Sequence, residues 1–307
     1  MEHEKINIKD SIDLESIKKI FANKTNEEKY LLELKTKLNN ALLDQKFKVL
    51  KSGKNKGKYS LKDKKETSNL IKDFWNYSVA KDIIRRIFAD TDKYKNGESA
   101  SVKYEIFIKE WVNLKLGELK WPCSQGEFDS LVQKINSKKI TTSEKDKEVE
   151  KDAIKYRRIK ELNTLKNDYL EFLIFENHKN IIPTLSHSKG VDFFIDGISY
   201  DQKVAKSPTN EFKENFGNQW KEEAIKNPSE VAKYLYTYQD EGRFGYSPRL
   251  YIVYLDEDIK PIDIQNRING IDLEKPLEIS FTYSHKDKDI VDKEYKTQAY
   301  VVLLYRR

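Results

Sequence analysis

Cysteine, histidine and long apolar runs are all scarce in this chain of 307 residues. The one cysteine, Cys123, excludes an internal disulfide and a cysteine-rich zinc site. No two of the four histidines have the spacing of metal ligands, which argues against a histidine-based metal site. No apolar run approaches the roughly 18 residues of a membrane-spanning helix, and the start, MEHEKINIKD, lacks the apolar stretch of a secretory signal. We therefore expect a cytoplasmic protein that does not enter a membrane.

Arginine is scarce as well, since it supplies only nine of the 57 basic residues, whereas lysine, asparagine and isoleucine are abundant throughout. The formal net charge is +6, and a basic balance suits a polyanionic partner such as nucleic acid. The same composition can reflect an AT-rich genome, so charge alone leaves nucleic-acid binding open. The 14 Phe, 18 Tyr and 4 Trp residues are ample for a folded core.

The first half of the chain has the spacing of helices. Leucines and alanines recur at helical intervals from 31 to 43 after an acidic first turn, and a second helix is predicted over 68–89. Between them, residues 47–61 form two alternating runs around a Gly/Lys/Asn turn, which predicts a hairpin. The lysines of this turn are Lys51, Lys54, Lys56 and Lys58. The hairpin either resembles the wing of a winged helix and contacts DNA phosphates, or is a solvated surface loop.

Residues 137–152 contain almost nothing that can be buried, so they form a linker or the exposed start of a long helix. We place a domain boundary near residue 150, between a mainly helical N-terminal domain (1–150) and a second domain (151–307). The second domain is predicted to be mixed α/β. Its expected elements are a helix over 153–178, strands within 181–204, helices over 211–239, and strands over 249–255, 277–283 and 298–305.

The segment GVDFFIDGISYDQK, residues 190–203, contains a strong hairpin turn at Asp196-Gly197. Pairing around this turn places residue 194 opposite 199, residue 193 opposite 200, and Asp192 opposite Asp201. Because side chains alternate between faces, one face is predicted to be apolar and to pack on the core. Its members are Val191, Phe193, Ile195, Ile198, Tyr200 and Val204. The outer face would carry Asp192, Phe194, Ser199, Asp201 and Lys203.

Two carboxylates directly across a strand pair repel each other unless something compensates their charge. A divalent cation between Asp192 and Asp201 would do so, and Mg²⁺ prefers oxygen ligands and also binds phosphate. Lys203, two residues beyond Asp201, would orient the attacking water or stabilise charge on a phosphate. The alternative is an ordinary hairpin with a polar outer face.

Asp192 followed by Asp201-Gln202-Lys203 resembles the motif of the PD-(D/E)XK nuclease superfamily, with Val191 in place of the usual proline. The resemblance covers roughly residues 153–256. It implies a restriction-endonuclease-like core, in which a helix, the acid-bearing hairpin, another helix and a further strand build a central mixed β-sheet flanked by helices. Members often add an acid from the first helix, here Glu171 or else Glu176, and Glu171 is preferred. Within the superfamily the chain is most similar to a type II restriction endonuclease.

Other residues are weaker candidates for DNA contact. Lys206 and Asn210 follow the hairpin and either contact phosphate or simply begin the next loop. Gln239 and Arg243 are of the types that read base edges in the major groove, but they would serve equally well to cap the helix before the strand at 249.

The expected activity is Mg²⁺-dependent hydrolysis of double-stranded DNA, with Asp192, Asp201 and Glu171 as metal ligands and Lys203 beside the cut. A homodimer is expected because most restriction sites are palindromic. Three alternatives stay open: a nuclease of repair, recombination or another defence role, a DNA-binding protein without catalysis, and an RNase.

Overall fold

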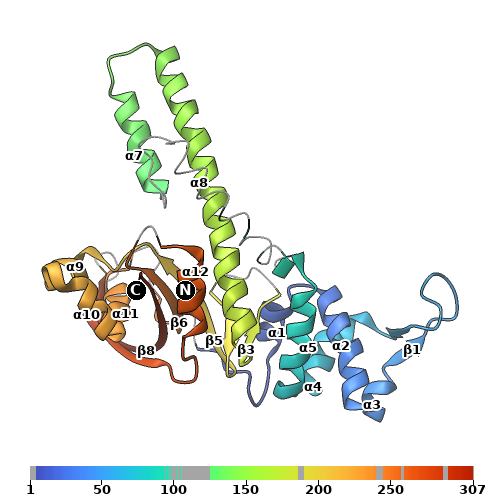
Figure 1. Ribbon diagram of the computed structural model, residues 1–307. Helices are drawn as coiled ribbons and strands as arrows, with labels where there is room; N and C mark the ends of the chain where they lie inside the picture. The colour runs from blue at the N-terminus through green and yellow to red at the C-terminus, as the bar shows by residue number, and fades with distance from the viewer. Residues whose placement is uncertain are drawn as a thin grey trace.

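The structure is a computed structural model that describes residues 5–92, 94–95, 97, 102, 105, 125–185, 190–239, 245–256, 259–285 and 290–306. It is an α+β protein, built around a six-stranded mixed sheet that helices flank (Figure 1). The mixed sheet expected from the sequence is confirmed at this level. No helix among these residues is long and apolar enough to span a bilayer.

The N-terminal part is helical, as expected, with one small hairpin. Its helices are α1 (Leu14–Phe21), α2 (Lys24–Leu38), α3 (Ala41–Asp44), α4 (Thr67–Asp73) and α5 (Tyr77–Ala89). Strands β1 (Phe47–Val49) and β2 (Tyr59–Leu61) pair antiparallel, which confirms the predicted hairpin. The single helix predicted over 68–89 is wrong. The chain breaks it at Asn76, whose side chain accepts a hydrogen bond from the Val79 N–H and so caps a new helix.

Among the described residues, two helices lie between the N-terminal part and the main sheet. Helix α7 (Gln125–Asn136) packs against the first part of α8 (Thr142–Asn177), and the two project away from the rest of the molecule (Figure 1). Thr141 and Glu144 form a capping box that starts α8, so residues 142–152 are the start of a long helix, which was one of the two predicted alternatives for this segment. The domain boundary expected near residue 150 therefore falls inside a continuous helix.

The main sheet has the strand order β3-β4-β5-β6-β8-β7. Its strands are β3 (Ile181–Pro183), β4 (Phe193–Ile195), β5 (Ile198–Ala205), β6 (Arg249–Tyr254), β7 (Leu277–His285) and β8 (Ile290–Leu304). Strands β3, β4 and β5 form an antiparallel meander, whereas β5–β6 and β6–β8 are parallel pairs. Strand β7 lies at the edge of the sheet and pairs antiparallel with β8.

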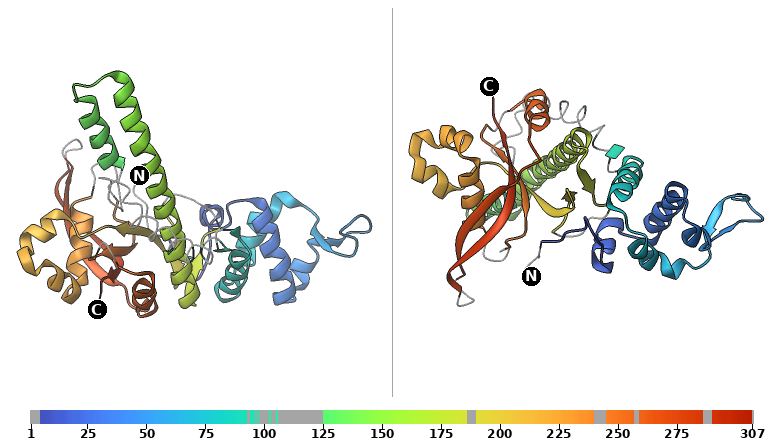
Figure 2. Two further views of the ribbon diagram at one scale, coloured as in Figure 1. Left: turned by 45° about the horizontal axis from the view of Figure 1, so that its top comes forward. Right: turned by 90° about the horizontal axis from the view of Figure 1, so that it is seen from below.

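Helices cover both faces of this sheet. Helix α8 and helix α12 (Pro261–Asn269) share one apolar core with the strands, and Tyr200, Leu250 and Tyr300 lie in it. Between β5 and β6 the chain forms α9 (Asn210–Phe216), α10 (Trp220–Lys226) and α11 (Pro228–Thr237), which pack on the opposite face. The N-terminal helices pack on this same face, but over β3 and β4, so in Figures 1 and 2 the two groups of helices lie toward opposite ends of the sheet.

The N-terminal part is joined to the acid-bearing hairpin by a continuous apolar core. Ile182, Val191 and Phe194 belong to the same buried cluster as the residues of α1, α2, α4 and α5. Residues before α1 also run along the start of β5, where the Ser199 N–H donates to the Ile6 carbonyl over 2.9 Å. The N-terminal helices therefore cover one face of β4 and fix that part of the sheet.

Candidate active site

The turn between β4 and β5 fixes the register of the candidate site. Asp196 and Gly197 have φ angles of 49° and 87°, as the predicted two-residue turn requires. Phe193 pairs with Tyr200 and Phe194 with Ser199, so the predicted register is confirmed. A Cβ atom on Gly197 would lie 2.9 Å from the Cβ of Lys9, so glycine is required there for space as well as for conformation.

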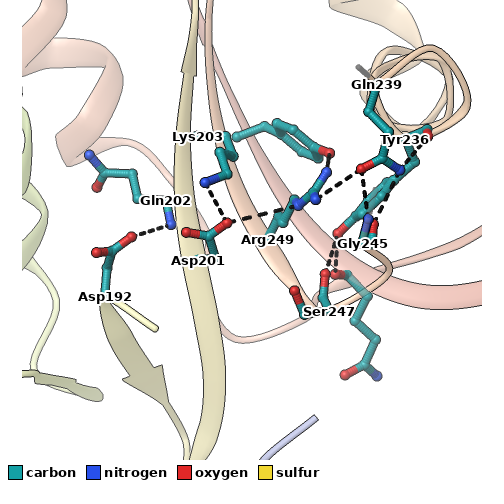
Figure 3. Close-up of polar contacts among 11 residues, drawn as sticks. Asp192, Asp201, Gln202, Lys203, Tyr236, Gln239, Gly245, Ser247 and Arg249 are labelled. Atoms are coloured by element: carbon teal, nitrogen blue, oxygen red, sulfur yellow. Dashed lines mark hydrogen bonds and ion pairs between the residues drawn. The ribbon is translucent and has the colours of Figure 1, made fainter. Parts of the chain in front are cut away.

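Asp192 lies directly before β4 and is held against β5 by two hydrogen bonds. Its backbone N–H donates to the Tyr200 carbonyl over 2.9 Å. Its carboxylate Oδ2 accepts a hydrogen bond of 2.7 Å from the backbone N–H of Gln202 (Figure 3). Because Gln202 stands between Asp201 and Lys203, this bond holds the Asp192 carboxylate beside the D-x-K segment.

Asp201 is buried, with 7% of its surface exposed, and it has two cationic neighbours. The ammonium of Lys203 lies 2.7 Å from its Oδ2 atom, and Nε of Arg249 lies 4.0 Å from the same oxygen. These two cations offset the charge of Asp201, a role for which the sequence pattern suggests a divalent ion. The ion pair confirms that Asp201 and Lys203 lie on the same side of β5.

The hairpin face opposite the predicted core face is itself buried at Phe194 and Ser199. Phe194 is completely buried and Ser199 is 3% exposed, because the N-terminal helices pack on this face. Val191 was assigned to the other face, yet it packs in the same cluster as Phe194, since β4 begins only at Phe193 and strand alternation does not reach back to 191. The acids therefore lie at the margin of a buried face.

Arg249 is the functional candidate that the sequence analysis missed. It begins β6 and pairs with Asp201 in the parallel ladder. Although burial opposes its charge, contacts with the Tyr251 and Tyr236 hydroxyls and with Asp201 raise the pKa of its guanidinium. The only signal in the sequence is a charged residue at the head of the apolar run RLYIVYL, and the run does not say which strand pairs beside it.

The third acid expected from α8 is not assembled with the other two. Among the described residues, no three His, Cys, Asp or Glu side chains are grouped so as to hold a metal ion, so Glu171 does not join Asp192 and Asp201 in such a cluster. Glu176 is engaged on the N-terminal side, where its Oε2 accepts a hydrogen bond from the Tyr94 hydroxyl.

Some of the remaining candidates have exposed side chains, and others form contacts within the protein. Lys54, Lys56 and Lys58 lie exposed in the loop between β1 and β2. Asn210 is exposed at the start of α9. Lys206 forms an ion pair of 2.9 Å with Glu127 of α7.

Gln239 is engaged within the protein at both ends of its carboxamide. Its Nε2 donates to the carbonyls of Tyr236 and Gly245, and its Oε1 accepts from the Gly245 N–H and from Arg249. These contacts favour the helix-capping interpretation over base reading. Arg243, its expected partner, lies outside the described residues.

Comparisons with protein-family models, with curated proteins and with solved structures found no match for this chain. The assignment of function therefore depends on the geometry of the hairpin and on the order of the elements around it.

Proposed function

We propose that this protein is a Mg²⁺-dependent endonuclease that hydrolyses phosphodiester bonds in double-stranded DNA, as a type II restriction endonuclease of the PD-(D/E)XK superfamily does. The observation that carries the proposal is the hydrogen bond from the Gln202 N–H to the Asp192 carboxylate. It brings the Asp192 carboxylate to the segment of β5 that carries Asp201 and Lys203. That combination suits charge stabilisation around a phosphate.

The order of the elements supports the proposal. Helix α8 leads through β3 to the β4–β5 hairpin, then α9 to α11 cross to β6, which pairs parallel with β5. This is the order of helix, hairpin, helix and strand that the resemblance implies. A restriction-endonuclease-like core is therefore part of the proposal.

The two carboxylates of the site are of the ligand type that Mg²⁺ prefers. The ion binds proteins through as few as one or two carboxylates and completes its octahedron with water and substrate phosphate oxygens. Asp192 and Asp201 supply the two carboxylates, so a third acid is not required. When bound, Mg²⁺ would polarise the phosphate and lower the pKa of water.

The side chains of the site then have distinct roles. Asp192 and Asp201 would hold the cation. The Lys203 side chain is half exposed and would move away from Asp201. It would then contact the phosphate and orient the attacking water. The net charge of +6 favours a polyanion, and the lysines of the β1–β2 loop offer phosphate contacts at a distance.

The proposal is tested by incubating the purified protein with unmodified phage DNA and Mg²⁺ and then sequencing the ends. Discrete fragments with a common end sequence are the expected result. Random ends would indicate a nuclease of repair, recombination or another defence role. Preferential loss of RNA in a mixed RNA and DNA reaction would indicate an RNase.

A second candidate function is a DNA-binding protein without catalysis, in which the hairpin is only structural. It is favoured by the charges around Asp201, because Lys203 and Arg249 already compensate that carboxylate. Binding of DNA that is independent of divalent cations, together with no nicking under any of them, would select this alternative.

A further inference from the structure

Arg249 has an unusual place in the molecule, because it is a charged residue at the head of a buried strand. Its side chain is 8% exposed, whereas that of Lys203, the other cation beside Asp201, is 50% exposed. Both lie near the same carboxylate oxygen. Arg249 is therefore the fixed cation of the pair, and Lys203 is the one that can move.

The guanidinium of Arg249 is held from two directions. Its Nη1 donates to the Tyr251 hydroxyl over 2.9 Å, and its Nη2 donates to Gln239 Oε1 over 3.1 Å (Figure 3). The ring of Tyr236 lies under the group, with 4.8 Å between Cζ and the ring centroid. These contacts fix the plane of the guanidinium, since a planar fork has little freedom once two of its nitrogens are bonded.

The third nitrogen, Nε, faces Asp201. It is buried, has no hydrogen-bond partner among the described residues, and lies 4.0 Å from Asp201 Oδ2. An unpaired buried donor costs about 1–3 kcal/mol. A modest rotation of the Asp201 carboxylate toward β6 would satisfy this donor.

We propose that Arg249 is a positioning residue, which fixes the Asp201 carboxylate in the orientation that binds a divalent cation once Lys203 moves to the phosphate. The effect of Arg249 on catalysis rests on the proposed function, whereas its effect on metal binding is measured without DNA cleavage. Arg249 also links Asp201 to the ends of the α11–β6 connection, because Gln239 bonds to Arg249 and to the Gly245 backbone.

The test substitutes Arg249 by lysine and by methionine, and measures Mn²⁺ binding to the intact, DNA-free protein by calorimetry. Groups that orient a metal ligand are typically worth about 10- to 100-fold in affinity. Both variants should therefore bind Mn²⁺ at least tenfold more weakly than the wild type. If Arg249 acted only as a nearby charge, Arg249→Met would bind Mn²⁺ more tightly because a competing cation is gone, and that result would overturn the inference.

Cleavage kinetics supply the second readout. Arg249→Lys should lower kcat for DNA cleavage about tenfold or more and leave KM for DNA within about threefold, because misplacing a reacting group affects the chemical step. Arg267→Lys is the matched control. It removes another arginine that stacks on a tyrosine ring, Tyr305, and bonds to its backbone, away from the acids.

Two milder variants keep the test decisive if both Arg249 variants fail to fold. Tyr251→Phe and Gln239→Leu each remove one acceptor and leave the guanidinium in place. Each should weaken Mn²⁺ binding by about threefold or more, and the double variant should deviate from additivity because both act through Arg249. Unchanged Mn²⁺ binding in both would contradict the inference.

The readouts separate this inference from the proposed function. Wild-type protein that binds Mn²⁺ through Asp201 without cutting DNA would contradict the function alone. Cleavage that is insensitive to Arg249→Lys would contradict the inference alone.

Discussion

At the scale of single residues, the Asp196-Gly197 turn predicted the register of the hairpin, because two positive φ angles define it. Within that register Asp192 bonds to the Gln202 backbone, and Lys203 pairs with Asp201. The register of the hairpin does not determine the position of the third acid, because the rotation of α8 against the sheet depends on side-chain packing along the whole helix. The position of Arg249 beside Asp201 could not be predicted either, since a sequence does not state which strands become parallel neighbours.

Lys166 of α8 provides a prediction that is independent of the site. It is 4% exposed, its ammonium lies 4.4 Å from the centroid of the Tyr254 ring, and burial lowers its pKa to about 8. Below pH 8 the folded protein carries the full cost of the buried charge. Between pH 8 and the ordinary value of 10.5 the folded state releases this proton before the unfolded state does, so this group makes the protein more stable as pH rises.

Lys166→Met should therefore be more stable than the wild type at pH 7, by at most about 3 kcal/mol, and this advantage should shrink toward pH 10. Urea unfolding at both pH values measures the difference. Lys160→Met, which removes an exposed lysine near the Tyr156 ring of the same helix, is the control and should show no such change. An advantage of Lys166→Met that is the same at both pH values would contradict the account.

At the scale of elements, the sequence predicted where strands lie better than where helices begin. The strand expected over 249–255 is β6, and the hairpin at 47–61 is present. Residues 142–152 offer no apolar face, so their pattern fits either a linker or a helix, although the Thr141 and Glu144 capping box that starts α8 is visible in the sequence. A helix of charged residues needs no buried face where it projects into solvent beside α7 (Figure 1).

The β1–β2 loop gives the prediction at this scale. Replacing Lys54, Lys56 and Lys58 by glutamine should weaken DNA binding on any sequence and reduce the slope of log affinity against log salt by up to about three. Titrations of labelled DNA at several salt concentrations measure both quantities. A second triple variant, of the exposed Lys139, Lys147 and Lys151 near the tip of the α7–α8 pair, removes the same charge elsewhere. Equal effects of the two triples would show that only net charge matters.

At the scale of the whole molecule, the N-terminal helices are part of the sheet's support. The sequence indicated a separate helical domain, but it did not indicate what covers the face with Phe194. Contacts between residues more than 100 positions apart decide that, and local periodicity carries no information about them. These helices cover β4, and residues 6–8 bond to the hairpin at Gly197 and Ser199, so the N-terminal part packs directly against the strands that carry the acids.

The proposed dimer belongs to the same scale. A palindromic DNA site would require two copies of the hairpin related by a two-fold axis. Sedimentation of the protein with and without a cleavable duplex measures the stoichiometry.

The central claim is tested most directly by cleavage of supercoiled plasmid in Mg²⁺ by the wild type, Asp201→Asn and Asp196→Asn. Asn at 196 suits the positive φ of the turn and removes an acid outside the proposed site, so this variant is the matched control. We predict that the wild type and Asp196→Asn cut equally, and that Asp201→Asn is slower by about 100-fold or more because it loses a metal-binding carboxylate. Undiminished cleavage by Asp201→Asn, or no cleavage by the wild type with any divalent cation, would contradict the account.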